Sequence, residues 1–406
     1  MANEGLDELM ARMARSRVNR RGFLAAAGLL GGSAALAACS PGSSASSAPA
    51  SAAPSTGAAS AAPSTAAAGS FPPAGAIEEE LFMYNWSDYT APANIEAFKA
   101  EFGVKNFVYD IFANNDELLA KLAGGATGYD FACPTAEFLP QMAEAGYIQK
   151  LDYSRIPNFK YIDPAFLSKP WDPNNEYHVP KDYGTTGIMY RPKLVSEPLT
   201  SWKEFYDLAV GKYSGRVILV DSAGDVLVMP LKMLGYSVNS IDPKELDEAS
   251  KLLQDLAPHV LALDSDTYQT KLANEEAVMA LAWVGGLLEL RANPATADVA
   301  YFVPSEGSLF WMDTWVMMAD APHPNATYAW LDFIQRPKEQ ALETTTFGYA
   351  TANLAAKKVL PPEMANEPAF FPPPEVVATL ESAIPAAADN ADRLAVWSKF
   401  KSSLGG

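Results

Sequence analysis

The sequence predicts an α/β protein of two lobes, each a mainly parallel sheet flanked by helices. Short apolar segments alternate with helical segments across short connections, which is the pattern of parallel strands covered on both faces. The pattern weakens in a Pro- and Asp-rich connection over residues 153–175 and resumes as a second run near residue 216. Because 49% of the 406 residues are hydrophobic, the chain can bury a large core. Two runs of comparable size therefore predict two lobes with a ligand cleft between them.

Residues 1–38 are expected to be an export signal. Arg20 and Arg21 are followed by Phe-Leu and an apolar run to Ala38, which resembles a twin-arginine (Tat) signal. The run is too short and too rich in small residues for a comfortable membrane-spanning helix. It ends in Leu-Ala-Ala before Cys39, which resembles a bacterial lipoprotein lipobox. We therefore expect Cys39 to be lipidated and to become the new N-terminus.

Residues 39–76 are expected to form a flexible tether. The stretch 40–75 holds no charged residue and consists mostly of Ser, Ala, Pro, Gly and Thr. Such a composition cannot bury enough apolar surface to offset the entropy of ordering the chain. The tether would let a folded domain, beginning near Ile77, stand off a membrane surface.

The first α/β run begins directly after the tether. Its strands are apolar stretches rich in β-branched and aromatic residues, and each is followed by a helical segment. The strands are expected at 81–86, 107–112 and 129–134, and the helices at 92–102, 115–123 and 136–145.

After the Pro- and Asp-rich connection, a strand is expected at 187–190 and a helix at 202–208. The second run then starts at 216, and its expected strands are 216–221, 277–283, 299–304 and 309–315. The expected helices from there on are 226–234, 243–256, 322–334, 337–345 and 387–404.

Composition excludes several classes of partner and site. The net charge of −18 disfavours nucleic acid and anionic membranes as partners and favours cationic ligands. The two cysteines are Cys39 and Cys133, so with Cys39 lipidated no intramolecular disulfide remains. The three histidines lie far apart and have no zinc-site spacing, so we expect no metal and no cofactor.

The stretch 309–315, Leu-Phe-Trp-Met-Asp-Thr-Trp, is the most informative segment. In a strand Trp311 and Asp313 share one face and Met312 takes the other. An indole beside a carboxylate is a poor core pair, but it is a good pair for an ammonium group, which the ring and the charge can both attract. The alternative is a core tryptophan with the aspartate at a solvated strand end.

Aromatic and acidic residues recur at the carboxyl ends of the expected strands, where parallel α/β sheets bind ligands. No lysine or arginine is among them. Each has a structural alternative, since Glu137 and Asp225 fall in first turns of helices and Ser222 could be an N-cap. The residues at these ends are Trp86, Ser87, Asp88, Tyr89, Thr135, Glu137, Asp221, Ser222, Asp225, Trp283, Trp311 and Asp313.

Four motifs together resemble one family. They are Asn-Trp-Ser-Asp-Tyr at 85–89, Trp-Asp-Pro-Asn-Asn at 171–175, Leu-Phe-Trp-Met-Asp at 309–313 and Gly-Tyr-Ala-Thr-Ala-Asn-Leu at 348–354. They occur in matching order in the periplasmic spermidine/putrescine-binding proteins of polyamine ABC transporters, over about 80–401. The resemblance implies a two-lobed type II periplasmic-binding fold with a hinge. The lobes would be 77–184 plus 314–367 and 185–313 plus 368–406.

The resemblance also implies ligand contacts. By position these are Trp86, Ser87, Asp88, Tyr89, Thr135, Glu137, Ser222, Asp225, Ser265, Trp283, Trp311, Asp313 and Tyr349. Two positions depart from the family. An aspartate of spermidine binders falls at Ser222, and an aspartate of putrescine binders falls at Gly286. The resemblance therefore predicts the ligand class rather than one polyamine.

The resemblance implies a substrate-binding lipoprotein that is not an enzyme and has no catalytic residues. It would be a monomer on the outer face of a bacterial cytoplasmic membrane, anchored only by its lipid, and would deliver a polyamine to ABC permease subunits. Two alternatives stay open. The same fold could bind a quaternary amine or a thiamine-like solute, or paired carboxylates beside tryptophans could cleave sugars. Against an enzyme, the chain has no G-x-S-x-G, H-E-x-x-H or P-loop motif.

Overall fold

The computed structural model describes residues 75–404. The expected signal at 1–38, the lipidation site Cys39 and almost all of the tether at 39–76 lie outside the described residues. The elements up to the first long strand are β1 (Glu80–Trp86), α3 (Pro92–Phe102), β2 (Asn106–Phe112), α4 (Asn115–Ala123), β3 (Phe131–Ala132), α5 (Leu139–Glu144) and four short 3-10 helices: Ala136–Phe138, Tyr153–Arg155, Pro157–Tyr161 and Pro164–Phe166.

The remaining elements begin with a long strand. They are β4 (His178–Tyr190), α6 (Trp202–Val210), β5 (Val217–Leu219), α7 (Ala223–Met233), α8 (Pro243–Leu256), a 3-10 helix at Ala257–His259, β6 (Val260–Leu263), α9 (Tyr268–Ala273), β7 (Met279–Trp283), α10 (Gly286–Ala292), β8 (Ala300–Phe302), β9 (Ser308–Met317), α11 (Pro324–Ile334), α12 (Pro337–Phe347), α13 (Leu354–Lys357), α14 (Pro362–Ala365), α15 (Pro374–Val377), β10 (Leu380–Ser382), α16 (Pro385–Ala388) and α17 (Ala391–Ser403).

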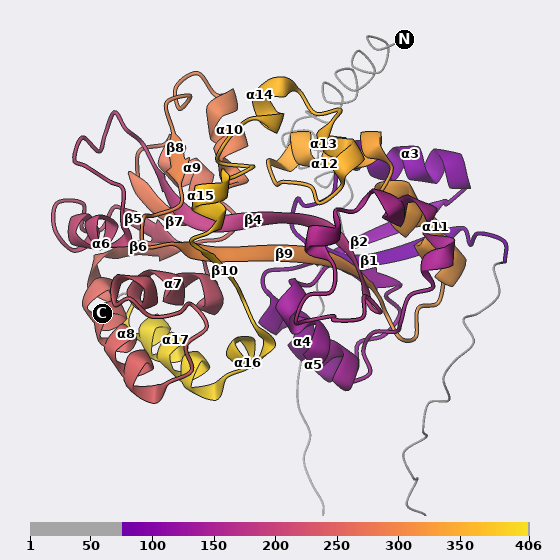
Figure 1. Ribbon diagram of the computed structural model, residues 1–406, viewed down its shortest axis with the longest axis horizontal. Coiled ribbons are helices and arrows are strands. Elements are labelled where there is room, and N and C mark those ends of the chain that lie inside the picture. Colours follow the sequence, from indigo (N-terminus) through magenta and orange to yellow (C-terminus); the bar gives the residue numbers. More distant parts are fainter. Residues whose placement is uncertain (1–74, 405–406) are drawn as a thin grey trace, which may run out of the picture. The chain divides into compact units, whose positions relative to one another are not determined.

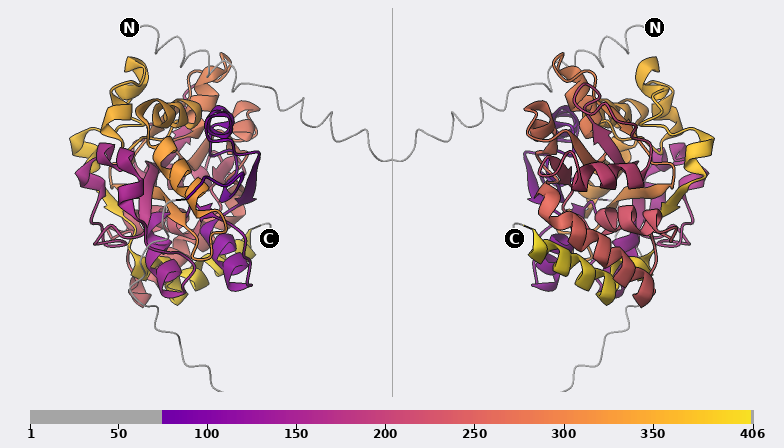
Figure 2. Two further views of the ribbon diagram at one scale, coloured as in Figure 1. Left: turned by 90° about the vertical axis from the view of Figure 1, so that its right-hand side faces the viewer. Right: turned by 90° about the vertical axis from the view of Figure 1, so that its left-hand side faces the viewer.

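Two groups of parallel strands confirm the predicted α/β class. In the first run β1 pairs in parallel with β2 and β3, and in the second β5 pairs in parallel with β6 and β7. Side chains alternate between the two faces, as the strand period requires. On β5, Val217 and Leu219 pack with the cluster of α7, α8 and α17, whereas Ile218 packs with the cluster of α9 and α10. The end views in Figure 2 show helices on both sides of the sheet.

Two long antiparallel strands join the groups into one ten-stranded mixed sheet. Strand β9 pairs with β3 and with the first part of β4. The second part of β4, from Thr186 to Tyr190, pairs instead with β7 and partly with β8. In Figure 1, β4 and β9 run side by side across the middle of the view. The sequence predicted most of β9, at 309–315, but it predicted only residues 187–190 of β4.

The last predicted helix, 387–404, is two helices. Helix α16 ends at Ala388, and α17 begins at Ala391 after the N-cap Asn390, whose side chain accepts a hydrogen bond from the Arg393 N–H. An asparagine competes for backbone hydrogen bonds and favours a cap over a helix interior. Helix α17 packs against the second run, beside α8 (Figure 1).

Candidate ligand-binding site

The first part of the site is built around Asp313 on β9. Its side chain is buried, and its Oδ2 lies 2.7 Å from the hydroxyl of Tyr89, which follows β1. Its Oδ1 is also buried and has no hydrogen-bond partner in the structure. Because an unpartnered buried carboxylate oxygen is costly, this atom marks a position where a donor from a ligand would be stabilising.

Tyr89, which contacts this carboxyl group, belongs to a cluster of three aromatic rings. Trp311 lies edge-to-face with Tyr349 at a centroid distance of 5.3 Å, and Tyr349 lies edge-to-face with Tyr89 at 5.4 Å. Gly184 of β4 lies under the Trp311 ring, where a Cβ would come within 2.4 Å of Cζ2. Met312 packs on the opposite face of β9, in the cluster of β1, α4 and α5. The predicted common face of Trp311 and Asp313 is therefore confirmed.

Burial and charge shift the protonation of Asp313. Desolvation, followed by the charge of Asp182, raises the pKa of Asp313 to about 7, while hydrogen bonds from Tyr89 and Thr135 act in the opposite direction. A cation at the free Oδ1 would reverse this balance, because an opposite charge within a few ångströms favours the ionised form.

A second carboxyl group stands at the start of α7. Asp225 is buried, and it accepts hydrogen bonds from Ser222 Oγ at 2.5 Å, from Thr186 Oγ1, and from Trp283 Nε1 at 3.1 Å. Burial raises the pKa of Asp225 and these hydrogen bonds lower it. Ser222 occupies the N-cap position, but its side chain bonds Asp225 rather than a backbone N–H. Asp225 does lie in the first turn of a helix, as the structural alternative stated. Its side chain also accepts hydrogen bonds from three other side chains, which a position in the first turn does not explain.

Glu137 lies close enough to both Asp313 and Asp225 to be affected by their charges, and a pair of tryptophans links the two parallel runs. Burial and the charges of Asp313 and Asp225 together raise the pKa of Glu137 to about 8. Trp86 lies edge-to-face with Trp283 at a centroid distance of 6.4 Å, and its Nε1 donates to the Cys133 carbonyl at 2.9 Å. The structure therefore gathers acidic and aromatic groups from both parallel runs into one site.

The four other predicted residues, Ser87, Asp88, Thr135 and Ser265, differ in exposure and in their contacts. Ser87 and Asp88 are exposed, and Asp88 has a positive φ of 48°. Thr135 is buried beside Asp313, and its hydroxyl accepts from Asn115 at 2.8 Å. Ser265 Oγ accepts from the Asp221 N–H at 3.0 Å and so fixes the loop after β5.

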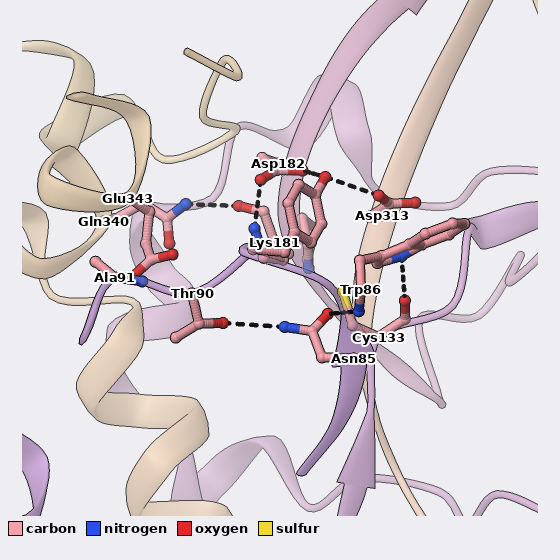
Figure 3. A network of polar contacts seen from close by, with 12 residues as sticks. Asn85, Trp86, Thr90, Ala91, Cys133, Lys181, Asp182, Asp313, Gln340 and Glu343 are labelled. Atoms are coloured by element: carbon pink, nitrogen blue, oxygen red, sulfur yellow. Dashed lines mark hydrogen bonds and ion pairs between the residues drawn. The ribbon is translucent and has the colours of Figure 1, made fainter. Parts of the chain in front are cut away.

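The sequence analysis missed three buried charges beside the site. Lys181 and Asp182 belong to β4, and Glu343 belongs to α12. Lys181 Nζ lies 2.5 Å from Asp182 Oδ2, and it sits 3.4 Å from the centroid of the Tyr89 ring. Figure 3 shows Lys181 and Asp182 between Asp313 and Glu343. The sequence signal for these charges was weak, because Pro180 disfavours a central strand and residues 178–186 include His178, Thr185 and Thr186 rather than a continuous apolar run.

The described residues suggest no metal centre and no membrane span. Over residues 75–404 no cluster of three or more His, Cys, Asp or Glu side chains is arranged to hold a metal ion. Within the same part of the chain, no helix combines the length and apolarity needed to cross a membrane.

Comparisons with known proteins point to one family. Residues 93–372 match the family model described as bacterial extracellular solute-binding protein. The spermidine/putrescine-binding periplasmic protein of Escherichia coli K12 is 36% identical over 73% of this chain and 84% of its own. The putrescine/agmatine-binding protein of Pseudomonas aeruginosa is 33% identical over 81% and 93%. The structure of the spermidine/putrescine ABC transporter substrate-binding protein of Streptococcus pneumoniae superimposes with a TM-score of 0.68, 29% identity, and 80% and 99% coverage.

Proposed function

The chain belongs to the bacterial extracellular solute-binding proteins, in the family of the spermidine/putrescine-binding periplasmic proteins, and we propose that it captures a polyamine for an ABC importer. One observation carries the proposal: Asp313 has a buried, unpartnered Oδ1, and its Oδ2 contacts the hydroxyl of Tyr89, whose ring packs in one cluster with Tyr349 and Trp311. A ligand ammonium would pair with the carboxylate there, and the rings would cover neighbouring methylenes.

The energies are sufficient for such a ligand. A charge-assisted hydrogen bond contributes ~1.5–3 kcal/mol, and a cation–π contact contributes ~0.5–2 kcal/mol. The second ammonium of a diamine would find Asp225, with the Trp283 indole beside it. Two such positions, added to burial of the methylene chain, would reach micromolar affinity, about −8 kcal/mol, after the costs of association.

We also propose that the site closes by a hinge between lobes at 77–184 plus 314–367 and 185–313 plus 368–406. The change of pairing partner along β4, between Thr185 and Thr186, supports a boundary there. Contacts such as Trp86 with Trp283 link the two parallel runs, so a ligand touching both would favour the closed state.

The position in the cell envelope rests on the N-terminal sequence. The Tat-like arginines and the lipobox occur in their expected order before Cys39, which supports a lipid-anchored protein outside the cytoplasmic membrane. Cys39→Ser should appear in the soluble fraction or keep its signal when cells are fractionated. Normal processing and anchoring of this variant would refute the lipid anchor. We propose a monomer without enzymatic activity, with the permease subunits as its protein partners.

A thermal-shift panel tests the function. Putrescine, spermidine, spermine and choline would be added to the purified protein, and a ligand at 100 times its Kd should add ~2.7 kcal/mol to the free energy of unfolding. We expect one or more polyamines to stabilise the protein and choline not to, because the quaternary ammonium of choline has no N–H to donate to Asp313. Stabilisation by choline alone would contradict the polyamine assignment.

A further inference from the structure

The hydroxyl of Tyr89 contacts two carboxyl groups at once. It lies 2.5 Å from Asp182 Oδ1 and 2.7 Å from Asp313 Oδ2. A phenol carries one hydrogen and can donate to only one of these oxygens. Two hydrogen bonds therefore require a second hydrogen, which one carboxyl group must supply by being protonated.

Lys181 decides which carboxyl group holds that proton. Its ammonium is fully buried and pairs with the other oxygen of Asp182, Oδ2, at 2.5 Å. The charges of Asp182 and Glu343 raise the pKa of Lys181 despite the opposing effect of burial, so the side chain is charged. An ammonium beside Asp182 favours its carboxylate form. Asp313 has no such partner, and its Oδ1 is free.

We propose that Asp313 holds a proton in the ligand-free protein and releases it when a diamine binds, and that Lys181 is the positioning residue that keeps this proton on Asp313. The inference rests on the proposed function. In the free state Asp313 donates to the Tyr89 hydroxyl, which donates to Asp182. On binding, the Asp313 O–H bond breaks, its proton passes to solvent, and the carboxylate pairs with the ligand ammonium.

The surroundings of Asp313 support this order of events. Burial first, and the Asp182 charge second, raise the pKa of Asp313 into the neutral range. The titratable groups that act on Asp313 or on Lys181 are Tyr89, Cys133, Glu137, Asp182, Glu343 and Tyr349. Of these, Glu137 and Glu343 are the other candidate sources of a released proton, since burial raises the pKa of Glu137 to about 8 and the pKa of Glu343 to about 7.

Isothermal titration with putrescine in buffers of different ionisation enthalpy measures the released protons. Putrescine ammonium groups resemble lysine, with a pKa near ~10.4, and stay charged between pH 6 and 8. Glu137→Gln combined with Glu343→Gln removes the two other proton sources. In this double variant we expect more protons to be released per ligand at pH 6 than at pH 8, and the affinity for putrescine to rise as the pH rises through about 7.

Lys181→Met tests the positioning role. Without the ammonium, the Asp182–Tyr89–Asp313 group keeps its proton more tightly, so the midpoint of the affinity–pH curve should move to higher pH. A lysine that only filled space would change affinity without moving this midpoint, and an unchanged midpoint overturns the role of Lys181. If this variant does not fold, the Glu137→Gln, Glu343→Gln double variant still decides whether Asp313 releases the proton.

The outcomes separate the two proposals. Putrescine binding with no released proton at pH 6 in the parent protein overturns the inference and leaves the function intact. Release that is present in the parent but disappears in the Glu137→Gln, Glu343→Gln double variant assigns the proton to one of those two groups and also overturns it. Absence of binding by any polyamine from pH 6 to 8 contradicts the proposed function itself.

Discussion

Asp313 and Glu343 are both buried carboxyl groups, but their surroundings differ. Glu343 Oε1 accepts hydrogen bonds from the Ala91 N–H at 3.0 Å and from Asn94 Nδ2 at 2.6 Å, and it lies in the field of Lys181. Each carboxyl group also keeps one buried oxygen without a partner, Oδ1 in Asp313 and Oε2 in Glu343. The leading charge beside Glu343 is the Lys181 ammonium, whereas the leading charge beside Asp313 is the Asp182 carboxylate, so an added cation is more favourable at Asp313.

The raised pKa of Glu343 lets us predict how the stability of the ligand-free protein depends on pH. Burial raises the pKa of Glu343 from 4.5 to about 7. The folded state therefore holds this proton more tightly than the unfolded chain does, and stability contributed by the group is present below pH 4.5 and is lost as the pH rises through about 7. Glu343→Gln cannot titrate, so its free energy of unfolding should fall less steeply across this range.

Urea denaturation at several pH values from 4.5 to 8 measures this difference. Glu375→Gln is a matched control, because Glu375 is exposed on α15. We expect Glu375→Gln to follow the parent protein at every pH. Curves for Glu343→Gln that also run parallel to the parent would show that Glu343 does not hold a proton in the folded state.

The sequence could predict where a residue lies when a local rule, such as strand alternation, fixes its position. The alternation of a strand placed Trp311 and Asp313 on one face, and the ends of parallel strands brought Asp225 and Trp283 within hydrogen-bonding distance. It could not predict the contact of Tyr89 with Asp182, which are separated by 93 positions. That contact depends on the pairing of β4 with β9, and no local pattern encodes it.

At the scale of elements, β4 is the feature that organises the site. Pro180 cannot donate to a ladder, and the register shifts between Pro180 and Asp182, so the proline is accommodated at an irregularity. Gly184 then gives the Trp311 ring room to lie against the strand. These two residues make the segment resemble a loop in the sequence, although the fold uses it as a central strand.

Gly184→Ala should disturb the site through Trp311. A Cβ would lie 2.4 Å from the ring, so the indole must move, at a cost of about 1–3 kcal/mol in the free energy of unfolding. Polyamine affinity should fall as well. Gly224→Ala in α7 is the control, because its Cβ meets nothing within 4 Å and alanine favours a helix by up to ~1 kcal/mol. Thermal denaturation that ranks the two variants equally would contradict the packing argument.

At the scale of the whole molecule, the sequence predicted the α/β class and the parallel groups, because alternating strands and helices leave few topologies. It did not predict that β4 and β9 join these groups in antiparallel order into one sheet. Helices α13 and α14 were also not expected; Leu360 and Met364 pack with α9 and α10 of the second run. Both features depend on contacts between distant segments.

Ligand binding should compact the protein. If the lobes move about β4 and β9, saturating putrescine should lower the radius of gyration measured by small-angle X-ray scattering. Asp313→Asn at the same putrescine concentration should keep the larger radius because it binds less ligand. An unchanged radius in the parent protein at saturation would contradict the hinge.

Calorimetric titration of the parent protein and Asp313→Asn with the best polyamine at pH 8 tests the central claim most directly. Asparagine keeps the size of the side chain and one acceptor oxygen but removes the charge. Affinity should fall by ~2–3 kcal/mol, some 30- to 150-fold, as expected for a lost charge-assisted hydrogen bond in a buried site. Trp311→Leu should also weaken binding, with a smaller dependence on salt. Equal affinity of Asp313→Asn and the parent would show that Asp313 is structural and that the ligand ammonium binds elsewhere.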